Sequence, residues 1–216
     1  MSANQDLTVG IGGFGAIGEK VARVLDSVDQ NGGIPGIHLV AVSARDHAGA
    51  RGRMTGMANP PPVVSLPELA GLADVVVECA PAAVFAQAAE AAVEAGKIFI
   101  PLSCGALLQH PHLIDRAADT GARIIVPTGA LLGLDAVRAA AEGVIHSVHM
   151  VTRKPPNGLA GAPHLVDNNI SVENLTAAKL VFAGTAREAA RGFPANVNVA
   201  AALSMAGNGP DNTSIE

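Results

Sequence analysis

Residues 7–18 read Leu-Thr-Val-Gly-Ile-Gly-Gly-Phe-Gly-Ala-Ile-Gly, an apolar strand pattern that runs directly into a glycine-rich turn. Gly13, Gly15 and Gly18 fit the pattern G-x-G-x-x-G, and a helical pattern follows at once. In this motif the first glycine makes a tight turn, the second lets the backbone approach a pyrophosphate, and the third lets the helix pack on the strand. The phosphates then meet free N–H groups at the helix N-terminus. The stretch therefore predicts a dinucleotide-binding βα unit.

Two other interpretations of this turn stay open at this point. An overlapping register, with Gly10, Gly12 and Gly15, also matches the pattern, but it would end the strand too early. The second alternative is a merely flexible glycine turn that binds nothing. We favour the later register. The residues of the turn that we expect to bind the cofactor are Gly13, Phe14, Gly15, Ala16 and Ile17.

The composition is that of a globular protein. Of the 216 residues, 49% are hydrophobic and 15% are charged, which allows a large core and argues against disorder. Aromatic residues make up only 2%, with no Trp or Tyr, which argues against stacking platforms for single-stranded nucleic acid. The net charge of −5, without a basic stripe, also disfavours a phosphate-backbone partner. We expect no nucleic-acid partner.

Nothing in the sequence predicts export or membrane insertion. The N-terminus lacks the charged start and apolar stretch of a secretory signal, and no apolar run is long enough to span a membrane. The two cysteines, Cys79 and Cys104, have neither metal-binding nor redox spacing. We expect a cytoplasmic protein with no membrane partner and no bound metal.

The rhythm of strands and helices changes after residue 127. Before that point, near-continuous apolar strands alternate with helices, which predicts a parallel sheet covered on both faces, with ligands at the carboxyl ends of its strands. After it, the pattern is mixed. The sequence predicts an α/β fold with a Rossmann-type, doubly wound parallel sheet over residues 1–127 and a second, smaller α+β domain over residues 128–216.

The expected elements can be given by range. In the first domain they are strands at 7–12, 37–43, 74–80, 97–102 and 122–127 and helices at 16–28, 81–95 and 112–120. In the second they are helices at 131–142, 186–192 and 198–206 and strands at 144–152 and 180–184.

The cofactor preference depends on the residues after the second predicted strand. In NAD-selective sheets an acidic residue at this strand end bonds the ribose hydroxyls, but here Ser43 and Ala44 are followed by Arg45 and then Asp46. Arg45 suits a 2′-phosphate, as in NADP sites. Both charges are equally well explained as solvated loop residues. The sequence predicts NAD or NADP without deciding between them.

Two other side chains stand at strand or helix ends. Cys104 lies where a helix N-terminus would lower the pKa of an acyl-enzyme nucleophile, as in semialdehyde dehydrogenases, but we favour a small buried hydrophobic residue. Glu78 ends the third predicted strand, and it either faces the cofactor crevice or caps the following turn.

Five segments, taken together, resemble L-aspartate dehydrogenases in order and spacing, over essentially the whole chain. They are ECA at 78–80, SCGAL at 103–107, PTGALLGLD at 127–135, TRKPP at 152–156 and FPANVNVAA at 193–201. The resemblance implies NAD(P)-dependent oxidative deamination of L-aspartate to iminoaspartate, which hydrolyses to oxaloacetate and ammonia. It also implies a link to pyridine nucleotide biosynthesis, because iminoaspartate is the precursor of quinolinate, and a homodimer formed through the second, catalytic domain.

The resemblance implies site residues as well. Ala130 and Asn196 match the family's NAD-contacting residues; the alternatives are a first-turn helix residue and an N-cap. The family position of Glu78 favours the crevice. Aspartate carries two carboxylates that need cations or N–H groups, and Lys154 is our candidate to bind one of them, with Arg153 as a weaker candidate. Either cation is alternatively a solvent-facing loop charge.

The family's catalytic histidine lies in an Asn-x-His segment beyond the position that Glu216 matches. None of the seven histidines of this sequence corresponds to it. We therefore expect no catalytic residue within these 216 residues and, unless the histidine is supplied otherwise, cofactor binding with little or no turnover. The alternatives to an aspartate dehydrogenase are a catalytically silent NAD(P)-binding module and a homoserine- or semialdehyde-type dehydrogenase.

Overall fold

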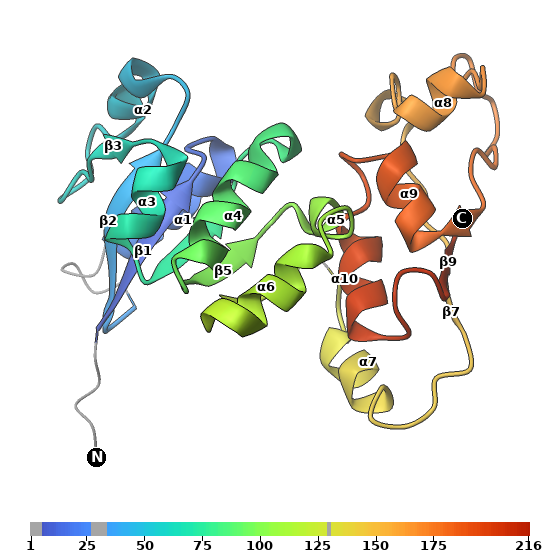
Figure 1. The fold of residues 1–216 in the computed structure, drawn as a ribbon. Helices are drawn as coiled ribbons and strands as arrows, with labels where there is room; N and C mark the ends of the chain where they lie inside the picture. Colours follow the sequence, from blue (N-terminus) through green and yellow to red (C-terminus); the bar gives the residue numbers. More distant parts are fainter. Residues whose placement is uncertain (1–5, 27–33, 129–130) are drawn as a thin grey trace. The chain divides into compact units, whose positions relative to one another are not determined.

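The structure is a computed structural model that describes residues 6–26, 34–128 and 131–216. The chain forms two compact units (Figure 1). The first contains the described residues up to Ser103 together with His112–Ile125, and the second contains Cys104–Pro111 and the described residues from Val126 onward. The sequence places residues 104–111 in the first domain, whereas in the structure this segment belongs to the second unit.

A six-stranded sheet forms the centre of the first unit, and every pair of neighbouring strands is parallel. The strand order is β3-β2-β1-β4-β5-β6, which is the order of a Rossmann-type fold, and it reverses between β1 and β4. This confirms the predicted fold class. The strands are β1 (Leu7–Gly12), β2 (Ile37–Ser43), β3 (Val63–Val64), β4 (Val75–Glu78), β5 (Ile98–Pro101) and β6 (Arg123–Ile124).

Helices cover both faces of this sheet. Successive residues of a strand point to opposite faces, so neighbouring residues of β1 contact different helices. On one face, Val9 and Ile11 of β1 share a core with Ala22 of α1. On the other face, Gly10 lets α3 approach closely, since a Cβ on it would lie 2.7 Å from Leu69 Cγ. The helices are α1 (Ala16–Asp26), α2 (His47–Arg53), α3 (Leu66–Leu72), α4 (Phe85–Glu94) and α6 (His112–Thr120), with a short 3-10 helix η2 (Ala82–Val84).

The second unit is a small α+β arrangement. Its sheet has the order β7-β9-β8, in which β7 (Val148–Met150) is parallel to β9 (Thr213–Ile215) and β8 (Gly184–Thr185) is antiparallel to it. Phe193, Leu165 and Cys104 share a buried core with residues of the helices. The helices are α5 (Cys104–Leu107), α7 (Leu134–Ala140), α8 (Pro163–Asp167), α9 (Ala186–Gly192) and α10 (Asn198–Ala206), with a 3-10 helix η3 (Pro156–Gly158).

The contact between α5 and α10 explains why residues 104–111 join this unit. The amide N–H of Gly105 donates to Asn198 Oδ1 at 3.0 Å, so the side chain at the start of α10 caps α5. A Cβ on Gly105 would lie 2.6 Å from Val197 Cγ2, and only glycine allows the two helices to come this close.

Several predicted bounds are wrong. The strand expected at 180–184 is irregular up to β8, and the strands at 122–127 and 144–152 shrink to β6 and β7. The elements β3, β9, α2, α3 and α8 were not predicted; α2 reads His-Ala-Gly-Ala-Arg-Gly-Arg, which has no apolar periodicity to reveal a helix. Within the described residues, no helix combines the length and apolarity needed to cross a bilayer.

Candidate functional site

The glycine turn follows β1 at the point where the strand order reverses. Because β1 runs through Gly12, the earlier glycine register does not fit. Gly13 has a φ of +104°, which L side chains rarely adopt, and its N–H donates to Ser43 O at the end of β2 over 2.9 Å. A Cβ on Gly13 would also lie 2.6 Å from the backbone of Cys79. Gly13 therefore makes the tight turn at this position.

The other two glycines of the turn differ in their surroundings. A Cβ on Gly18 would overlap the carbonyl oxygen of Gly13, so only glycine lets α1 start this close to the strand. By contrast, no described atom lies within 4 Å of a Cβ built on Gly15. α1 begins at Ala16, and the N–H groups of its first turn have no partner within the helix. The open space at Gly15, beside these N–H groups, fits the pyrophosphate of a dinucleotide.

Phe14 and Ile17 take different positions in this turn. Phe14 is buried in the core of the first unit, and the Arg53 guanidinium lies 5.8 Å from its ring centroid. Only the backbone of Phe14 is therefore available to a ligand. Ile17 is 61% exposed on the first turn of α1, so its side chain is accessible.

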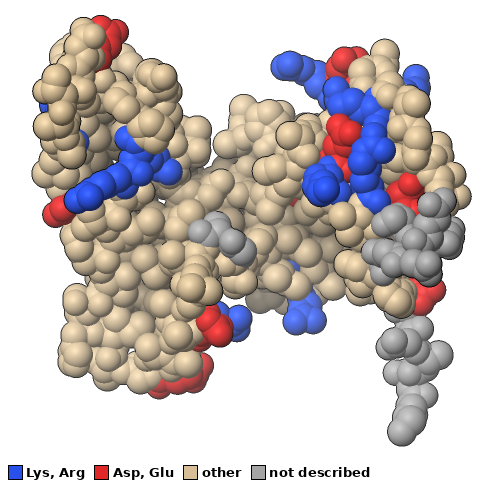
Figure 2. Space-filling model, turned by 180° about the vertical axis from the view of Figure 1, so that it is seen from behind, with Lys and Arg blue, Asp and Glu red and all other residues tan. Residues whose placement is uncertain are grey.

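The two charged residues that follow β2, Arg45 and Asp46, have different surroundings. Asp46 is the N-cap of α2, and its Oδ1 accepts from the Gly49 N–H at 2.9 Å. Arg45 is exposed, and within the described part of the chain it makes no ion pair. Figure 2 shows Lys and Arg side chains gathered on the first unit, with acidic groups among them. Arg23 and Arg53 of this unit pair with Glu19, which neutralises part of that charge.

Glu78, at the carboxyl end of β4, points into the protein. Its side chain is 0% exposed. Oε1 accepts from the Ala80 N–H at 2.8 Å and from Ser103 Oγ at 3.2 Å, while Oε2 accepts from the Ser103 N–H at 3.0 Å. Burial raises the pKa of this carboxyl, and the hydrogen bonds from Ser103 and Ala80 oppose the rise. Of the two interpretations, the cap of the following turn fits the structure, and a position facing the crevice does not.

Neither cysteine has the surroundings of a nucleophile. Burial, with a smaller contribution from the charge of Glu78, raises the pKa of the Cys79 thiol to about 12, so the thiol stays protonated near neutral pH. Cys104 is 4% exposed within the apolar core of the second unit, beside Leu108 and Leu165. This favours the buried hydrophobic residue over the acyl-enzyme nucleophile.

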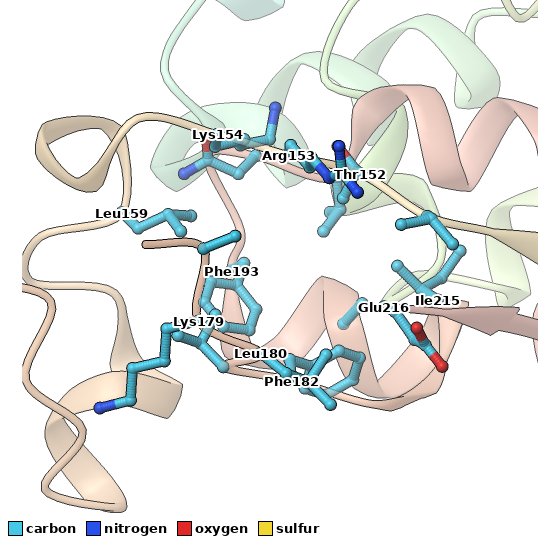
Figure 3. A pocket seen from close by; sticks show the side chains of 16 residues that line it. Thr152, Arg153, Lys154, Leu159, Lys179, Leu180, Phe182, Phe193, Ile215 and Glu216 are labelled. Carbon is cyan, nitrogen blue, oxygen red and sulfur yellow. The ribbon is translucent and has the colours of Figure 1, made fainter. Parts of the chain in front are cut away.

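The second unit contains a cavity of about 260 Å³ (Figure 3). Thr152, Arg153 and Lys154 lie along one side of it, and Leu180 and Phe182 lie on the opposite side. The sequence predicted Lys154, Arg153 and Asn196 as site residues, and the fold brings all three to this cavity. Its apolar wall was not predicted, because Leu180 and Phe182 come from an irregular segment interpreted as a strand.

Asn196 is held by the neighbouring loop. Its Nδ2 donates to Gly158 O at 2.9 Å, and the N-cap of α10 is Val197, so Asn196 is not an N-cap. Ala130 lies outside the described residues. All seven histidines are described, and none of them lines this cavity; His149, for example, lies on the sheet with its Nδ1 2.8 Å from Ser214 Oγ. Within the ranges that the structure describes, no group of three His, Cys, Asp or Glu side chains is arranged to hold a metal ion.

The strand order of the sheet and a glycine turn shaped for a pyrophosphate define a dinucleotide-binding protein of the Rossmann type. Comparisons with known proteins agree with this class. Residues 13–127 match the family model described as "Homoserine dehydrogenase, NAD binding domain", and residues 135–216 match "Aspartate dehydrogenase, C-terminal". These two models together span most of the chain and support a pyridine nucleotide cofactor.

Full-length relatives identify the family. An L-aspartate dehydrogenase of Bradyrhizobium diazoefficiens is 50% identical over all of this chain and 75% of its own length, and L-aspartate dehydrogenase 3 of Bordetella bronchiseptica is 51% identical over all of this chain and 78% of its own. The chain belongs to the L-aspartate dehydrogenase family. The crystal structure of an aspartate dehydrogenase from Thermotoga maritima shares the fold, with a TM-score of 0.67 and 21% identity over 97% of this chain and 77% of that one.

Proposed function

We propose that this protein is an NAD(P)-dependent dehydrogenase that converts L-aspartate to iminoaspartate, which hydrolyses to oxaloacetate and ammonia. The observation that carries the proposal is the 50% identity, over the whole chain, to a relative named for this activity. A bound NAD(P) would supply the hydride acceptor for this oxidation. The residues of this chain bind and orient: the turn from Gly13 to Ile17 takes the pyrophosphate, Ala130 and Asn196 contact the dinucleotide, and Lys154 takes a substrate carboxylate.

The supporting test measures binding before turnover. Because the sequence has no Trp or Tyr, the fluorescence of NADH or NADPH reports binding without background from the protein. L-Aspartate, L-homoserine and L-glutamate are then titrated into the protein saturated with NAD or NADP. We expect L-aspartate to bind at least tenfold more tightly than the other two. Tighter binding of L-homoserine would favour the homoserine-type alternative, and dinucleotide binding without any amino-acid binding would favour the silent module.

Turnover is measured as formation of the reduced nicotinamide from L-aspartate. No histidine lines the cavity beside Lys154, so little or no turnover stays the expectation unless a histidine is supplied otherwise. Turnover at a rate typical of dehydrogenases would contradict this expectation. Where turnover is measurable, a Cys104→Ser variant that keeps full activity rules out the thiol nucleophile of the semialdehyde-type alternative.

Replacing Lys154 with methionine is expected to raise the Kd for L-aspartate about tenfold or more, because a charge-assisted hydrogen bond is lost. Lys154 is exposed, so the melting temperature and the Kd for the dinucleotide should not change. Lys179→Met is the matched control in the same cavity, since Lys179 Nζ already donates to Ser171 O at 3.0 Å and turns away from the cavity in Figure 3. Equal losses in both variants would remove Lys154 as the carboxylate ligand.

Replacing Arg45 with alanine is expected to weaken NADPH binding about tenfold and to leave NADH binding nearly unchanged. The reason is that Asp46 is engaged as the cap of α2, which leaves Arg45 as the group at this strand end suited to a 2′-phosphate. Arg51→Ala, on the exposed side of α2, is the control and should change neither Kd. If Arg45→Ala alters both affinities equally, Arg45 does not read the 2′-phosphate.

We also infer three properties from the family resemblance: a homodimer formed through the second domain, a role in pyridine nucleotide biosynthesis, and a cytoplasmic location. Cys79 and Cys104 are not joined in a disulfide, which fits a reducing compartment. Light scattering of the purified protein tests the dimer, since a monomer at micromolar concentration would contradict it.

A further inference from the structure

We propose that Glu78 is a positioning residue of the dinucleotide site, where its carboxylate fixes the backbone of residues 79–80 against the glycine turn. The proposal rests on the dinucleotide binding proposed above. Glu78 does not reach a ligand itself, because its side chain is completely buried. Its effect passes through the turn that it caps.

The burial of this carboxylate requires an explanation. Removing an ionised group from water is costly unless hydrogen bonds replace the lost solvent. Among the described residues, Glu78 is the charged side chain that the structure buries completely; the other buried polar side chains are the hydroxyls of Ser43, Ser204 and Thr213. Backbone N–H and hydroxyl donors on two successive connections, after β4 and after β5, satisfy both oxygens of Glu78.

The connection after β4 packs against the glycine turn. β4 and β1 are in register, with Gly12 opposite Glu78, and the Cys79 N–H donates to Gly12 O at 2.7 Å. A Cβ on Gly13 would lie 2.6 Å from Ala80 N. The backbone that Glu78 holds is therefore the wall against which the turn packs, and a small shift of Ala80 would move Gly13.

Backbone hydrogen bonds also link the carboxyl ends of the neighbouring strands β2, β1, β4 and β5. The Gly13 N–H donates to Ser43 O after β2, and the Leu102 N–H donates to Glu78 O beside β5. The side chain of Glu78 adds to these backbone bonds, since its carboxylate accepts from the N–H groups of both Ala80 and Ser103. Without it, the ends of β4 and β5 would keep their backbone pairing but lose the side-chain link between Ala80 and Ser103.

An amide cannot replace the carboxylate at this position. Each oxygen of Glu78 accepts from a backbone N–H, so either orientation of a glutamine would place its NH₂ donor against an N–H donor. Glu78→Gln is nearly the same in size and tests the acceptor pattern directly. Ser103→Ala is a milder variant, because it removes the hydroxyl bonds to Oε1 and, at 3.5 Å, to Ala80 O, and leaves both backbone N–H bonds to the carboxylate.

Asp74 provides a matched control at the other end of β4. Its Oδ2 accepts from the N–H and the hydroxyl of Thr8, at 3.0 and 2.6 Å, so it also ties β4 to β1 through a carboxylate. It lies at the amino end of the strands, away from the glycine turn. Asp74→Asn therefore weakens a solvent-exposed carboxylate clamp between β4 and β1 without touching the wall of the proposed site.

The experiment measures the Kd for NADH by cofactor fluorescence and the melting temperature by circular dichroism for the four proteins. We expect Glu78→Gln to raise the Kd about tenfold at temperatures where it is fully folded, Ser103→Ala to raise it two- to threefold, and Asp74→Asn to lower the melting temperature with the wild-type Kd. If Glu78→Gln lowers only the melting temperature, or if Asp74→Asn raises the Kd equally, the proposal is overturned. If Glu78→Gln does not fold, Ser103→Ala decides alone, and an unchanged Kd overturns the proposal. Absence of NADH binding by the wild-type protein would overturn the proposed function and this inference together.

Discussion

Replacing Gly18 with alanine is expected to destabilise the first unit by about 3 kcal/mol or more and to abolish dinucleotide binding. The added methyl group would overlap the carbonyl oxygen of Gly13 and lie 3.2 Å from Ile11 Cγ2. The overlapping atom belongs to the backbone, so a side-chain rotation cannot relieve the clash. α1 must then move away from β1, and its first turn leaves the place where it faces the phosphates. Denaturant unfolding and NADH fluorescence measure the two effects.

Gly71→Ala is the control for this substitution. Gly71 lies in α3, and no described atom is within 4 Å of a Cβ built there. An alanine in a helix is about 1 kcal/mol more favourable than a glycine, so this variant should be equally or more stable and bind NADH normally. A Gly18→Ala variant as stable as Gly71→Ala would contradict the close packing of α1 against the glycine turn.

Replacing Gly15 with alanine is expected to raise the Kd for NADH and NADPH tenfold or more with no loss of stability. Gly15 does not have a positive φ, it is exposed, and the space around its Cβ position is open. The protein therefore tolerates the methyl group. The dinucleotide does not, because the methyl group occupies the space in which the pyrophosphate approaches the backbone.

The contrast between Gly15 and Gly18 is the informative part of this pair. Both are motif glycines, but one is required by the fold and the other only by the ligand. Melting temperatures measured with and without NADH separate the two, since a bound ligand stabilises the folded state by an amount that grows with the logarithm of its concentration divided by its Kd. An unchanged Kd for Gly15→Ala would show that the phosphates do not lie at this turn.

The regular part of the fold is largely predictable from the sequence. Strand β2 and helices α6, α9 and α10 have the predicted bounds, because each has a clear period and a clear stop. Helix α3 was missed although Ser65 and Glu68 form a capping box in which each side chain bonds the other's backbone. Its seven residues contain a proline and a glycine, which hide the helical period. The short strand β9 has no signal of its own, because its pairing with β7 and β8 determines it.

The site is only partly predictable for a related reason. The glycine motif is local, and the backbone at Gly13 and the clash at Gly18 follow from it. The burial of Glu78 depends on Ser103, which is 25 residues away in sequence, and no pattern in either segment indicates that they meet. The lining of the Lys154 cavity likewise comes from segments distant in sequence.

Helix α5 belongs to the second unit although it lies between two segments of the first in sequence. This matters for any attempt to transplant the nucleotide-binding unit into another enzyme. The chain passes from one unit to the other after residues 103, 111 and 125, so three connections join the units instead of a single linker. A graft that ends at residue 127 would carry α5 without α10 and expose Cys104 and Leu108, which belong to the core of the second unit, to water. A soluble chimera must either bring α10 along or redesign these side chains as polar ones.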